Sequence, residues 1–403
     1  MHEVVVTGVG PILARCDSRA RMWQQVAEGQ SQLSFEAAPG APGERWPVGR
    51  VGELQPEPYL GELTPRVAAF WARYHQDQRL YLASLGRALA DAGLSPSTLP
   101  TGRTGLYDGS SRQSFDGWYA RIRGESERAE AEAYTGRDLM LGTPGQAASL
   151  AACLLGTRGP AYTLTATCAS GAVATGLALR DLASGEVDVA LASGHDSALS
   201  RPIHCMYRDT GLLSGERAEA GRAVRAFQEH SRNAFGEGAV TLVLETAAHA
   251  RRRGARPLAL LRGYGYGNHA QHPTSVDPSG ARAAEVIIGI LERARFDRER
   301  VGFVLGHGNG VPQSDLSELA YMKQVFGPRG DSIPLLTTKP IWGHTLGASS
   351  AVNLAVAALM LSERRVAARP GEAGGTRPLE GSAGLVVSFG IGGHIAALLL
   401  EAP

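Results

Sequence analysis

Cysteine and lysine are both scarce in this sequence of 403 residues. The four cysteines are Cys16, Cys153, Cys168 and Cys205. They form no CxxC pair and no metal-ligand spacing, so the sequence predicts neither a disulfide framework nor a metal site. The two lysines of the chain are Lys323 and Lys339. Because arginine cannot replace a compact ammonium at every site, each lysine is a candidate for a specific role.

The sequence also lacks a charge imbalance and a long apolar run. A formal net charge of +1 gives no global electrostatic reason to bind nucleic acid or an anionic membrane. No apolar stretch approaches the ~18–20 residues that a membrane span needs. The chain enters the strand-like run Val4–Val6 without a basic or apolar leader. We therefore expect a cytoplasmic protein whose partners include neither nucleic acid nor a membrane.

The hydrophobic pattern is that of a mixed α/β protein. Short β-branched runs that end in glycine or serine alternate with alanine- and leucine-rich stretches of helical period. The glycine-punctuated opening Val5–Gly10 is similar to the later stretch Leu260–Gly265. This internal similarity predicts two similar halves, which we place at residues 1–250 and 251–403.

The sharpest local feature surrounds Cys168, in the segment YTLTATCASG (162–171). A β-rich run stops at this cysteine, and small residues then open a long amphipathic stretch. Such a turn would set the sulfur at a helix N-terminus, where unpaired N–H groups and the helix dipole favour the thiolate. Unpaired cysteines are more often small core residues, so this motif alone leaves both interpretations open.

Two histidines stand at further junctions between strands and loops. His307 lies at the tip of a glycine-rich loop, GHGNGVP (306–312), where it could donate a hydrogen bond or shuttle a proton. In the segment 337–348, Lys339 precedes His344 by five residues, on a loop that leads into another alanine-rich helix. Taken singly, either histidine could be a loop residue without a function.

A glycine-rich turn follows the last long β-run. It contains Phe389, Gly390, Ile391 and Gly392. Glycines break a strand in this way where backbone amides must approach a reacting group closely. Alone, a GxGG pattern is a weak signal.

Together, and in this order, the four segments resemble the ketosynthase family, the condensing enzymes of fatty-acid and polyketide synthesis, in its elongating type II branch. The family's nucleophile motif matches at Cys168, its HGTGT-type loop at His307, and its KxxxGH motif at Lys339 and His344. Its GFGG-type turn is similar to 389–393. The resemblance covers nearly the whole chain and implies a thiolase fold, in which two similar halves form a five-layered αβαβα sandwich.

The resemblance also implies a decarboxylative Claisen condensation. Cys168 would accept an acyl group from the phosphopantetheine of an acyl carrier protein. His307 and His344 would hydrogen-bond the malonyl thioester carbonyl as carbon dioxide leaves. The carbanion would then attack acyl-Cys168, with amides of Cys168 and Ile391 holding the second oxyanion. No bound cofactor is implied.

Further roles follow from the resemblance alone. Lys339 would support the site electrostatically through Glu318, and Asp315 and Glu318 would be its supporting acidic residues. Asn309 and Val311 would contact the pantetheine arm. The acyl tunnel would be lined by Gly109, Ser110, Ser111 and Ile391.

The chain departs from the family pattern at several of these positions. Asn309 and Val311 replace two threonines, Asn353 replaces a glutamate, and Ile391 replaces the aromatic residue of the glycine-rich turn. His394 stands where a small polar residue is usual. None of these departures removes a reactive group. Because together they change the surroundings of the reactive groups, we expect a specialised enzyme of secondary metabolism.

Two other functions remain open. An acyltransferase would use Cys168 without decarboxylation. A partner subunit similar to the chain-length factors would not condense at all, although such subunits typically lack the nucleophilic cysteine. Family members are dimers, so we expect either a homodimer or a heterodimer with a subunit of the chain-length-factor type.

Overall fold

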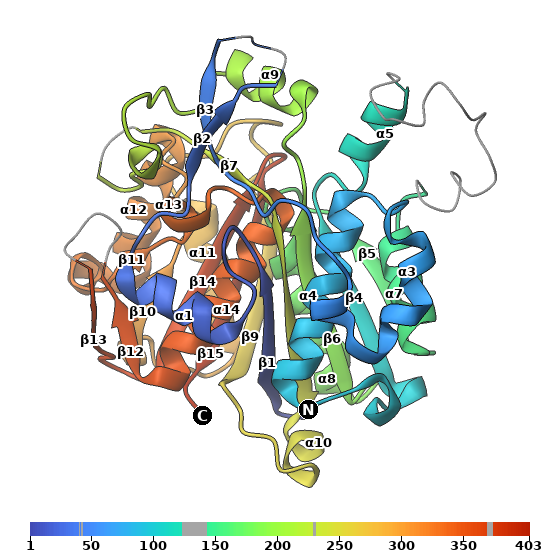
Figure 1. Ribbon diagram of the computed structural model, residues 1–403. Coiled ribbons are helices and arrows are strands. Elements are labelled where there is room, and N and C mark those ends of the chain that lie inside the picture. The colour runs from blue at the N-terminus through green and yellow to red at the C-terminus, as the bar shows by residue number, and fades with distance from the viewer. Residues whose placement is uncertain (40, 42, 123–142, 229–230, 369–373) are drawn as a thin grey trace.

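The computed structural model describes residues 1–39, 41, 43–122, 143–228, 231–368 and 374–403 (Figure 1). The strands are β1 (Val4–Ile12), β2 (Ser34–Ala37), β3 (Arg45–Gly49), β4 (Thr104–Ser110), β5 (Ala161–Leu164), β6 (Val189–Asp196), β7 (Phe235–Gly236), β8 (Gly238–Thr246), β9 (Ala259–Asn268), β10 (Val301–Leu305), β11 (Leu335–Leu336), β12 (Arg365–Ala367), β13 (Thr376–Pro378), β14 (Ala383–Gly390) and β15 (His394–Glu401).

The helices are α1 (Arg19–Glu28), α2 (Glu57–Leu60), α3 (Thr64–Trp71), α4 (Gln76–Ala92), α5 (Phe115–Ile122), α7 (Gln146–Leu155), α8 (Ser170–Ser184), α9 (Arg201–Asp209), α10 (Ala247–Arg252), α11 (Ala281–Arg293), α12 (Pro312–Phe326), α13 (Lys339–Trp342) and α14 (Ser349–Glu363). A short 3₁₀ turn, η7 (Leu346–Ala348), precedes α14.

Ten strands form one sheet in the order β11-β10-β14-β15-β9-β1-β8-β6-β4-β5. Each half contributes five strands to this sheet. Numbered in chain order within their half, they lie side by side in the order first, fifth, fourth, second, third. The directions repeat as well, because β4 is parallel to β5 and β6, as β10 is to β11 and β14. The predicted α/β fold of two similar halves is therefore confirmed.

The two halves meet at their first strands. The similar segments Val5–Gly10 and Leu260–Gly265 lie in β1 and β9, which pair antiparallel from Val4 opposite Leu261 to Val6 opposite Ala259. On its other side, β1 pairs with β8 along nearly its whole length. Backbone hydrogen bonds therefore run without a break from one half into the other.

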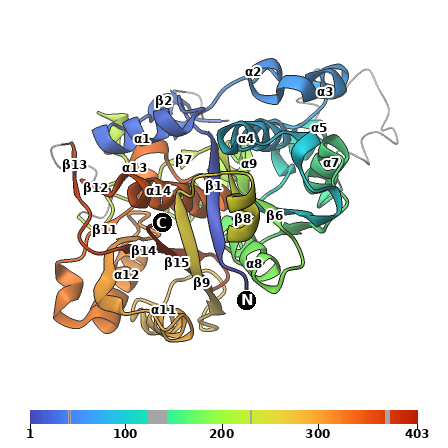
Figure 2. The same cartoon turned by 90° about the horizontal axis from the view of Figure 1, so that it is seen from below.

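The helices complete a five-layered arrangement (Figure 2). Helices α4 and α7 cover the outer face of the first half of the sheet, and α11 covers the second half, with α12 packed beside it. Helices α8 and α14 lie between the two halves, where they contact each other and strands of both. These two middle helices position the site, because each begins beside a predicted catalytic residue.

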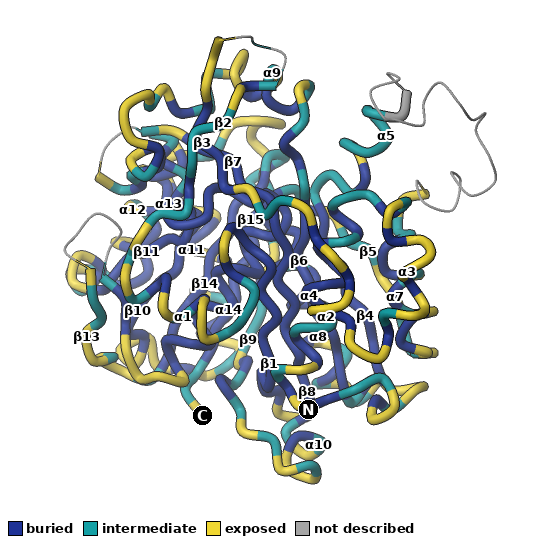
Figure 3. The backbone as a smooth tube through the Cα atoms, viewed as in Figure 1, coloured by how far each residue is buried: buried dark blue, intermediate teal, exposed yellow. Residues whose placement is uncertain are grey.

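The middle layer is the most buried part of the molecule (Figure 3). The window Leu346–Glu363, which contains η7 and α14, has a mean hydropathy of 1.4 and the length of a membrane span. The expectation that no apolar stretch comes near that length is therefore wrong. Inside the protein 89% of this window is buried, because α14 is covered by strands on both sides and is apolar all round.

Candidate active site

The predicted site residues follow the carboxyl ends of parallel strands, where ligand sites of α/β proteins are typically found. Cys168 comes after β5, which is the third strand of the first half, and Lys339 and His344 come after β11, the third strand of the second. His307 follows β10, and Phe389 lies at the end of β14. All these strand ends face the upper part of Figure 1, where α9 and α13 lie.

A tight turn holds Cys168 at the start of α8. Thr167 adopts a left-handed conformation, with φ of 50°. The Ser170 hydroxyl closes the turn, because it accepts a hydrogen bond from the amide of Ala166 (2.9 Å) and donates to the carbonyl of Thr167 (2.6 Å). All four cysteines are free, and Cys168 is buried. The sulfur is thus fixed by a pre-formed turn at the helix N-terminus.

The protonation state of Cys168 differs from the expectation. Burial raises the pKa of the thiol to about 11, and this outweighs the Lys339 ammonium, which lowers it. The Asp196 carboxylate raises the pKa further, and the Arg112 guanidinium lowers it. Near neutral pH the helix N-terminus therefore holds a thiol.

His307 and His344 form a buried pair. Their ring centroids lie 5.4 Å apart and the rings are nearly perpendicular, at 86°. Burial and the Lys339 ammonium lower the pKa of both imidazoles well below the ordinary value, so both are neutral near pH 7. His344 Nδ1 lies 2.7 Å from the Ser349 hydroxyl. When that hydroxyl donates to Nδ1, the ring proton is on Nε2 and can be donated to a ligand.

The loop of His307 is held at its main chain by two charged side chains. The Glu318 carboxylate accepts hydrogen bonds from the amides of His307 (2.7 Å) and Gly308 (2.5 Å). The Lys339 ammonium donates to the carbonyl of His307. Burial raises the pKa of Glu318 and lowers that of Lys339, whereas the two amides favour the Glu318 carboxylate and that carboxylate favours the Lys339 ammonium. The predicted link between Lys339 and Glu318 therefore runs through the backbone of His307.

Asn353 completes this support. Its amide donates to the carbonyl of Gly306 (2.8 Å), and its side-chain oxygen accepts from the Thr338 hydroxyl (2.7 Å). One residue of α14 thus ties the end of β10 to the start of α13. A glutamate lacks the N–H donor that the Gly306 carbonyl uses here, so Asn353 gives the loops on both sides a neutral connection.

Two further predicted groups lie beside this loop. The Asp315 carboxylate accepts a hydrogen bond from the amide of Phe227 (2.8 Å), and it lies within electrostatic reach of Lys339 and Glu318, where it raises the pKa of both. The side-chain oxygen of Asn309 accepts from the amide of Val311 (3.0 Å). This bond shapes the turn before α12. The pantetheine contact of Asn309 and Val311 stays a prediction.

The glycine-rich turn packs directly on the turn of Cys168. A Cβ on Gly390 would collide with the Thr167 hydroxyl and the Ala166 carbonyl, so this approach requires a glycine. The Thr167 hydroxyl donates to the carbonyl of Ile391 (3.0 Å). Phe389 places its ring 5.9 Å from that of His307. The turn thus connects the cysteine to the histidine pair.

Backbone donors remain available at this junction. Within the described residues, neither the amide of Cys168 nor that of Ile391 donates a hydrogen bond to another residue. The carbonyl of Gly392 is already engaged, because it accepts a hydrogen bond from the Asn268 side chain (2.6 Å). Two adjacent amides of this kind suit a negatively charged oxygen.

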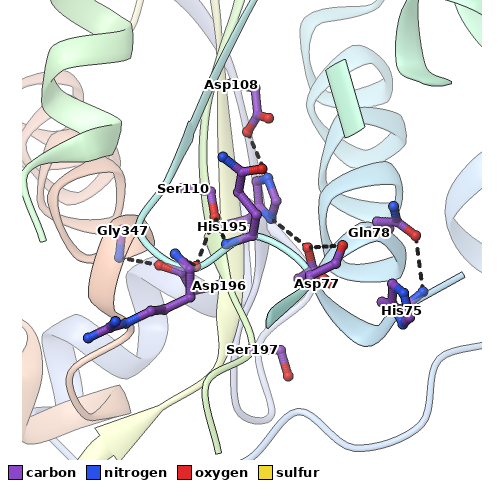
Figure 4. Close-up of polar contacts among 12 residues, drawn as sticks. His75, Asp77, Gln78, Asp108, Ser110, His195, Asp196, Ser197 and Gly347 are labelled. Atoms are coloured by element: carbon purple, nitrogen blue, oxygen red, sulfur yellow. Dashed lines mark hydrogen bonds and ion pairs between the residues drawn. The ribbon is translucent and has the colours of Figure 1, made fainter. Parts of the chain in front are cut away.

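The sequence reasoning missed a buried carboxylate between the halves. Asp196, at the end of β6, accepts hydrogen bonds from the amides of Ser111 (3.0 Å), Arg112 (2.9 Å) and Gly347 (2.6 Å), and from the Ser110 hydroxyl (2.9 Å) (Figure 4). It thereby ties the loop after β4 to η7, beside His344. The charged residues that interrupt the buried run of β6 (VALASGHD) were the available signal.

A second buried cluster lies next to Asp196 (Figure 4). His195 Nε2 lies 2.7 Å from Asp108 Oδ1, and Nδ1 lies 4.0 Å from Asp77 Oδ2. Burial lowers the pKa of His195, but the two carboxylates outweigh it and raise the pKa to about 9. Tyr81 stacks on the ring at 4.9 Å. This charged imidazole joins α4, β4 and β6.

Comparisons with known proteins agree with this architecture. The family model of the N-terminal domain of β-ketoacyl synthases matches residues 1–250, and that of the C-terminal domain matches residues 258–370. A β-ketoacyl synthase 1 of oxytetracycline polyketide synthesis from Streptomyces rimosus is 31% identical over 371 residues, which cover 89% of this chain and 85% of the relative.

Solved structures show the same fold. A type II polyketide ketosynthase bound to a hexaketide, in complex with its acyl carrier protein, has a TM-score of 0.85 at 22% identity and covers 100% of both chains. The ishigamide ketosynthase/chain length factor has a TM-score of 0.85 at 23% identity, covering 100% of this chain and 99% of the other.

Proposed function

The chain belongs to the β-ketoacyl synthase family of acyltransferases, and on that premise we propose that Cys168, His307 and His344 carry out its condensation. The supporting observation is that one ammonium, Lys339, lowers the pKa of the buried Cys168 thiol and of both paired imidazoles, while the turn of Ile391 is bonded to the turn of Cys168. Lys339 is a positioning residue in this proposal, and the glycine-rich turn supplies the amide of Ile391.

The first step is thioester exchange. The Cys168 sulfur attacks the acyl carbonyl carbon, the bond from that carbon to the pantetheine sulfur breaks, and the proton lost by Sγ ends on the departing pantetheine thiol. Because burial raises the pKa of Cys168 to about 11, the nucleophile is a protonated thiol in the free enzyme. The Lys339 ammonium stabilises the thiolate once it forms.

The second step is decarboxylation and condensation. As carbon dioxide leaves the malonyl group, the electron pair of the broken C–C bond passes into an enolate whose oxygen accepts N–H hydrogen bonds from His307 and His344. Neutral imidazoles suit this role because each has one N–H to donate and no charge to lose. The enolate carbon attacks acyl-Cys168, and the amides of Cys168 and Ile391 hold the oxyanion before the sulfur leaves.

The related proteins indicate which carrier protein and which partner subunit to propose for this chain. The related ketosynthases act in polyketide synthesis, and the solved ones include a complex with an acyl carrier protein and a pair with a chain length factor. We propose that this chain also takes its substrates from the phosphopantetheine of an acyl carrier protein. A heterodimer with a subunit of the chain-length-factor type is the assembly that these relatives favour.

The test is to offer the purified chain, alone and with candidate partner subunits, first acyl and then malonyl carrier protein. Intact mass should show one acyl group on the protein, and each β-ketoacyl product should be accompanied by one carbon dioxide. Acyl transfer without carbon dioxide release would replace condensation with an acyltransferase function. No adduct from any donor would instead support a partner subunit that does not condense.

Replacing Lys339 with methionine should move the acidic limb of the pH profile for malonyl decarboxylation to higher pH. The imidazoles work as neutral donors, so activity falls as the pH drops through their pKa values. After burial, the Lys339 ammonium is the next largest cause that lowers both values. Without this ammonium, both imidazole pKa values should rise toward the ordinary one. On lowering the pH, the variant should therefore lose activity earlier than the parent protein does.

The matched control is Lys323→Met, because Lys323 is exposed near the end of α12. Its profile should coincide with that of the parent protein. An unshifted acidic limb in Lys339→Met would show that the ammonium does not set the protonation of the histidine pair.

A further inference from the structure

The loop after β4 is the counterpart of the His307 loop. β4 is the second strand of the first half and β10 is the second strand of the second half, and each loop follows the carboxyl end of its strand. The repeated topology therefore brings Ser110–Arg112 to the site from the half that carries Cys168. A Cβ on Gly347 would lie 2.6 Å from the amide nitrogen of Ser111, so this loop also packs tightly against η7.

Asp196 fixes the backbone of this loop, and hydrogen bonds already engage both oxygens of its carboxylate. Asp196 accepts two hydrogen bonds at each carboxylate oxygen, from Ser110 and Arg112 at one and from Ser111 and Gly347 at the other. The carboxylate is therefore satisfied by neutral donors. It orients the main chain of Arg112 without forming an ion pair with its guanidinium.

The Arg112 guanidinium has no matched anion. Its Nε is buried without a hydrogen-bond partner, and Nη2 lies at the long distance of 3.4 Å from the Tyr207 hydroxyl. No carboxylate in the described part of the chain forms an ion pair with it. The Asp196 carboxylate lies within electrostatic reach of this guanidinium but forms no ion pair with it. A partly buried guanidinium without a paired anion is costly to maintain in a folded protein, so its retention points to a ligand.

The surroundings of this guanidinium belong to the site of Cys168. Tyr207 and Cys168 lie in one apolar cluster with Phe235 and Ile391. Tyr207 packs edge-on against Phe235 at 4.7 Å, and Phe235 pairs with His344 through the backbone. The guanidinium also lowers the pKa of Cys168, so it lies within electrostatic reach of the sulfur.

On the basis of the condensing function proposed above, we infer that the acyl group accepted by Cys168 carries a terminal carboxylate, which Arg112 binds. A guanidinium pairs with a carboxylate through two parallel hydrogen bonds, a geometry that an alkyl chain cannot offer. The loading step would be thioester exchange, in which an ω-carboxyacyl group passes from pantetheine sulfur to Cys168 and the pantetheine leaves as its thiol.

The extender carboxylate is a poorer match for Arg112. Decarboxylation converts that carboxylate to neutral carbon dioxide, and an ion pair with a guanidinium would stabilise the reactant and slow its loss. The half of the site that activates the malonyl group contains His307 and His344, which are neutral. Arg112 therefore acts as a specificity-determining residue for the first substrate.

The experiment compares carrier proteins loaded with succinyl or glutaryl groups against butanoyl or pentanoyl groups of the same chain length. The rate of the mass increase on Cys168 is measured for the parent protein, Arg112→Leu and Arg112→Lys. We expect the parent to accept carboxyacyl groups at least ~10-fold faster, as for a charged hydrogen bond worth about 1.5–3 kcal/mol. Arg112→Leu should reverse the preference, and Arg112→Lys should keep part of it.

A reversed preference cannot arise from misfolding, because Arg112→Leu must still accept alkanoyl groups. Equal ratios in the parent and in Arg112→Leu would overturn this inference and leave the condensing function intact. A parent protein that prefers alkanoyl groups would do the same. Failure of every donor to acylate the parent would overturn the proposed function, and with it the role of Arg112.

Discussion

Cys168→Ala should abolish acyl loading, so that intact mass shows no adduct from any carrier protein. Sγ is the nucleophile of the proposed exchange, and alanine offers no replacement. The substitution removes a buried sulfur but no hydrogen bond of the turn, because Ser170, Ala166 and Thr167 close that turn themselves. The thermal midpoint should therefore change little, and the missing adduct would report chemistry and not unfolding.

The control is Cys153→Ala, which removes a free cysteine that is exposed. This variant should load acyl groups at the parent rate. In Cys168→Ala, carbon dioxide release from malonyl carrier protein should persist, since the histidine pair does not need the sulfur. An acyl adduct that survives in Cys168→Ala would place the nucleophile elsewhere.

His307→Ala and His344→Ala should each slow carbon dioxide release by about 10²–10³-fold, the usual cost of removing one donor from a developing oxyanion. Acyl loading of Cys168 should remain measurable, which separates this effect from a general loss of the site. The loop should stay in place in His307→Ala, because Glu318 and Lys339 hold the main chain and not the ring.

The double variant should lose much less than the product of the two single effects, because residues that act on one oxygen act as a unit. His272→Ala is the control, since this histidine is exposed and, among the residues that the structure describes, bonds only to its own loop at Thr274 and Ser275. Full decarboxylation in either active-site variant would remove that histidine from the proposed mechanism.

The sequence contained enough information for the fold and for the placement of the candidate residues at strand ends. Cys168, His307 and Phe389 each stand where an apolar run stops at small residues, and a strand that meets a loop leaves this local pattern. The similarity of Val5–Gly10 to Leu260–Gly265 also had a direct structural cause. These segments are the equivalent first strands of the two halves, and they pair with each other.

Interactions between distant segments could not be predicted in the same way. Asp196 and Gly347 are 151 positions apart, and no local pattern announces their hydrogen bond. The protonation of Cys168 could not be predicted either, because a helix N-terminus was visible in the sequence, whereas the burial that raises the pKa of the thiol was not. The membrane-length window 346–363 was overlooked because Ser349, Ser350 and Asn353 interrupt its apolar residues.

The placement of β1 in the sheet affects how the protein can fold during its synthesis on the ribosome. β1 leaves the ribosome before the other described strands, yet its hydrogen-bonding partners β8 and β9 begin only at Gly238 and Ala259. At about 5–20 residues per second, this apolar strand waits on the order of ten seconds or longer before either neighbour exists. An unpaired strand of that kind readily joins other chains, so the nascent protein should depend on early cover from α4, which packs against β1 and is made long before β8.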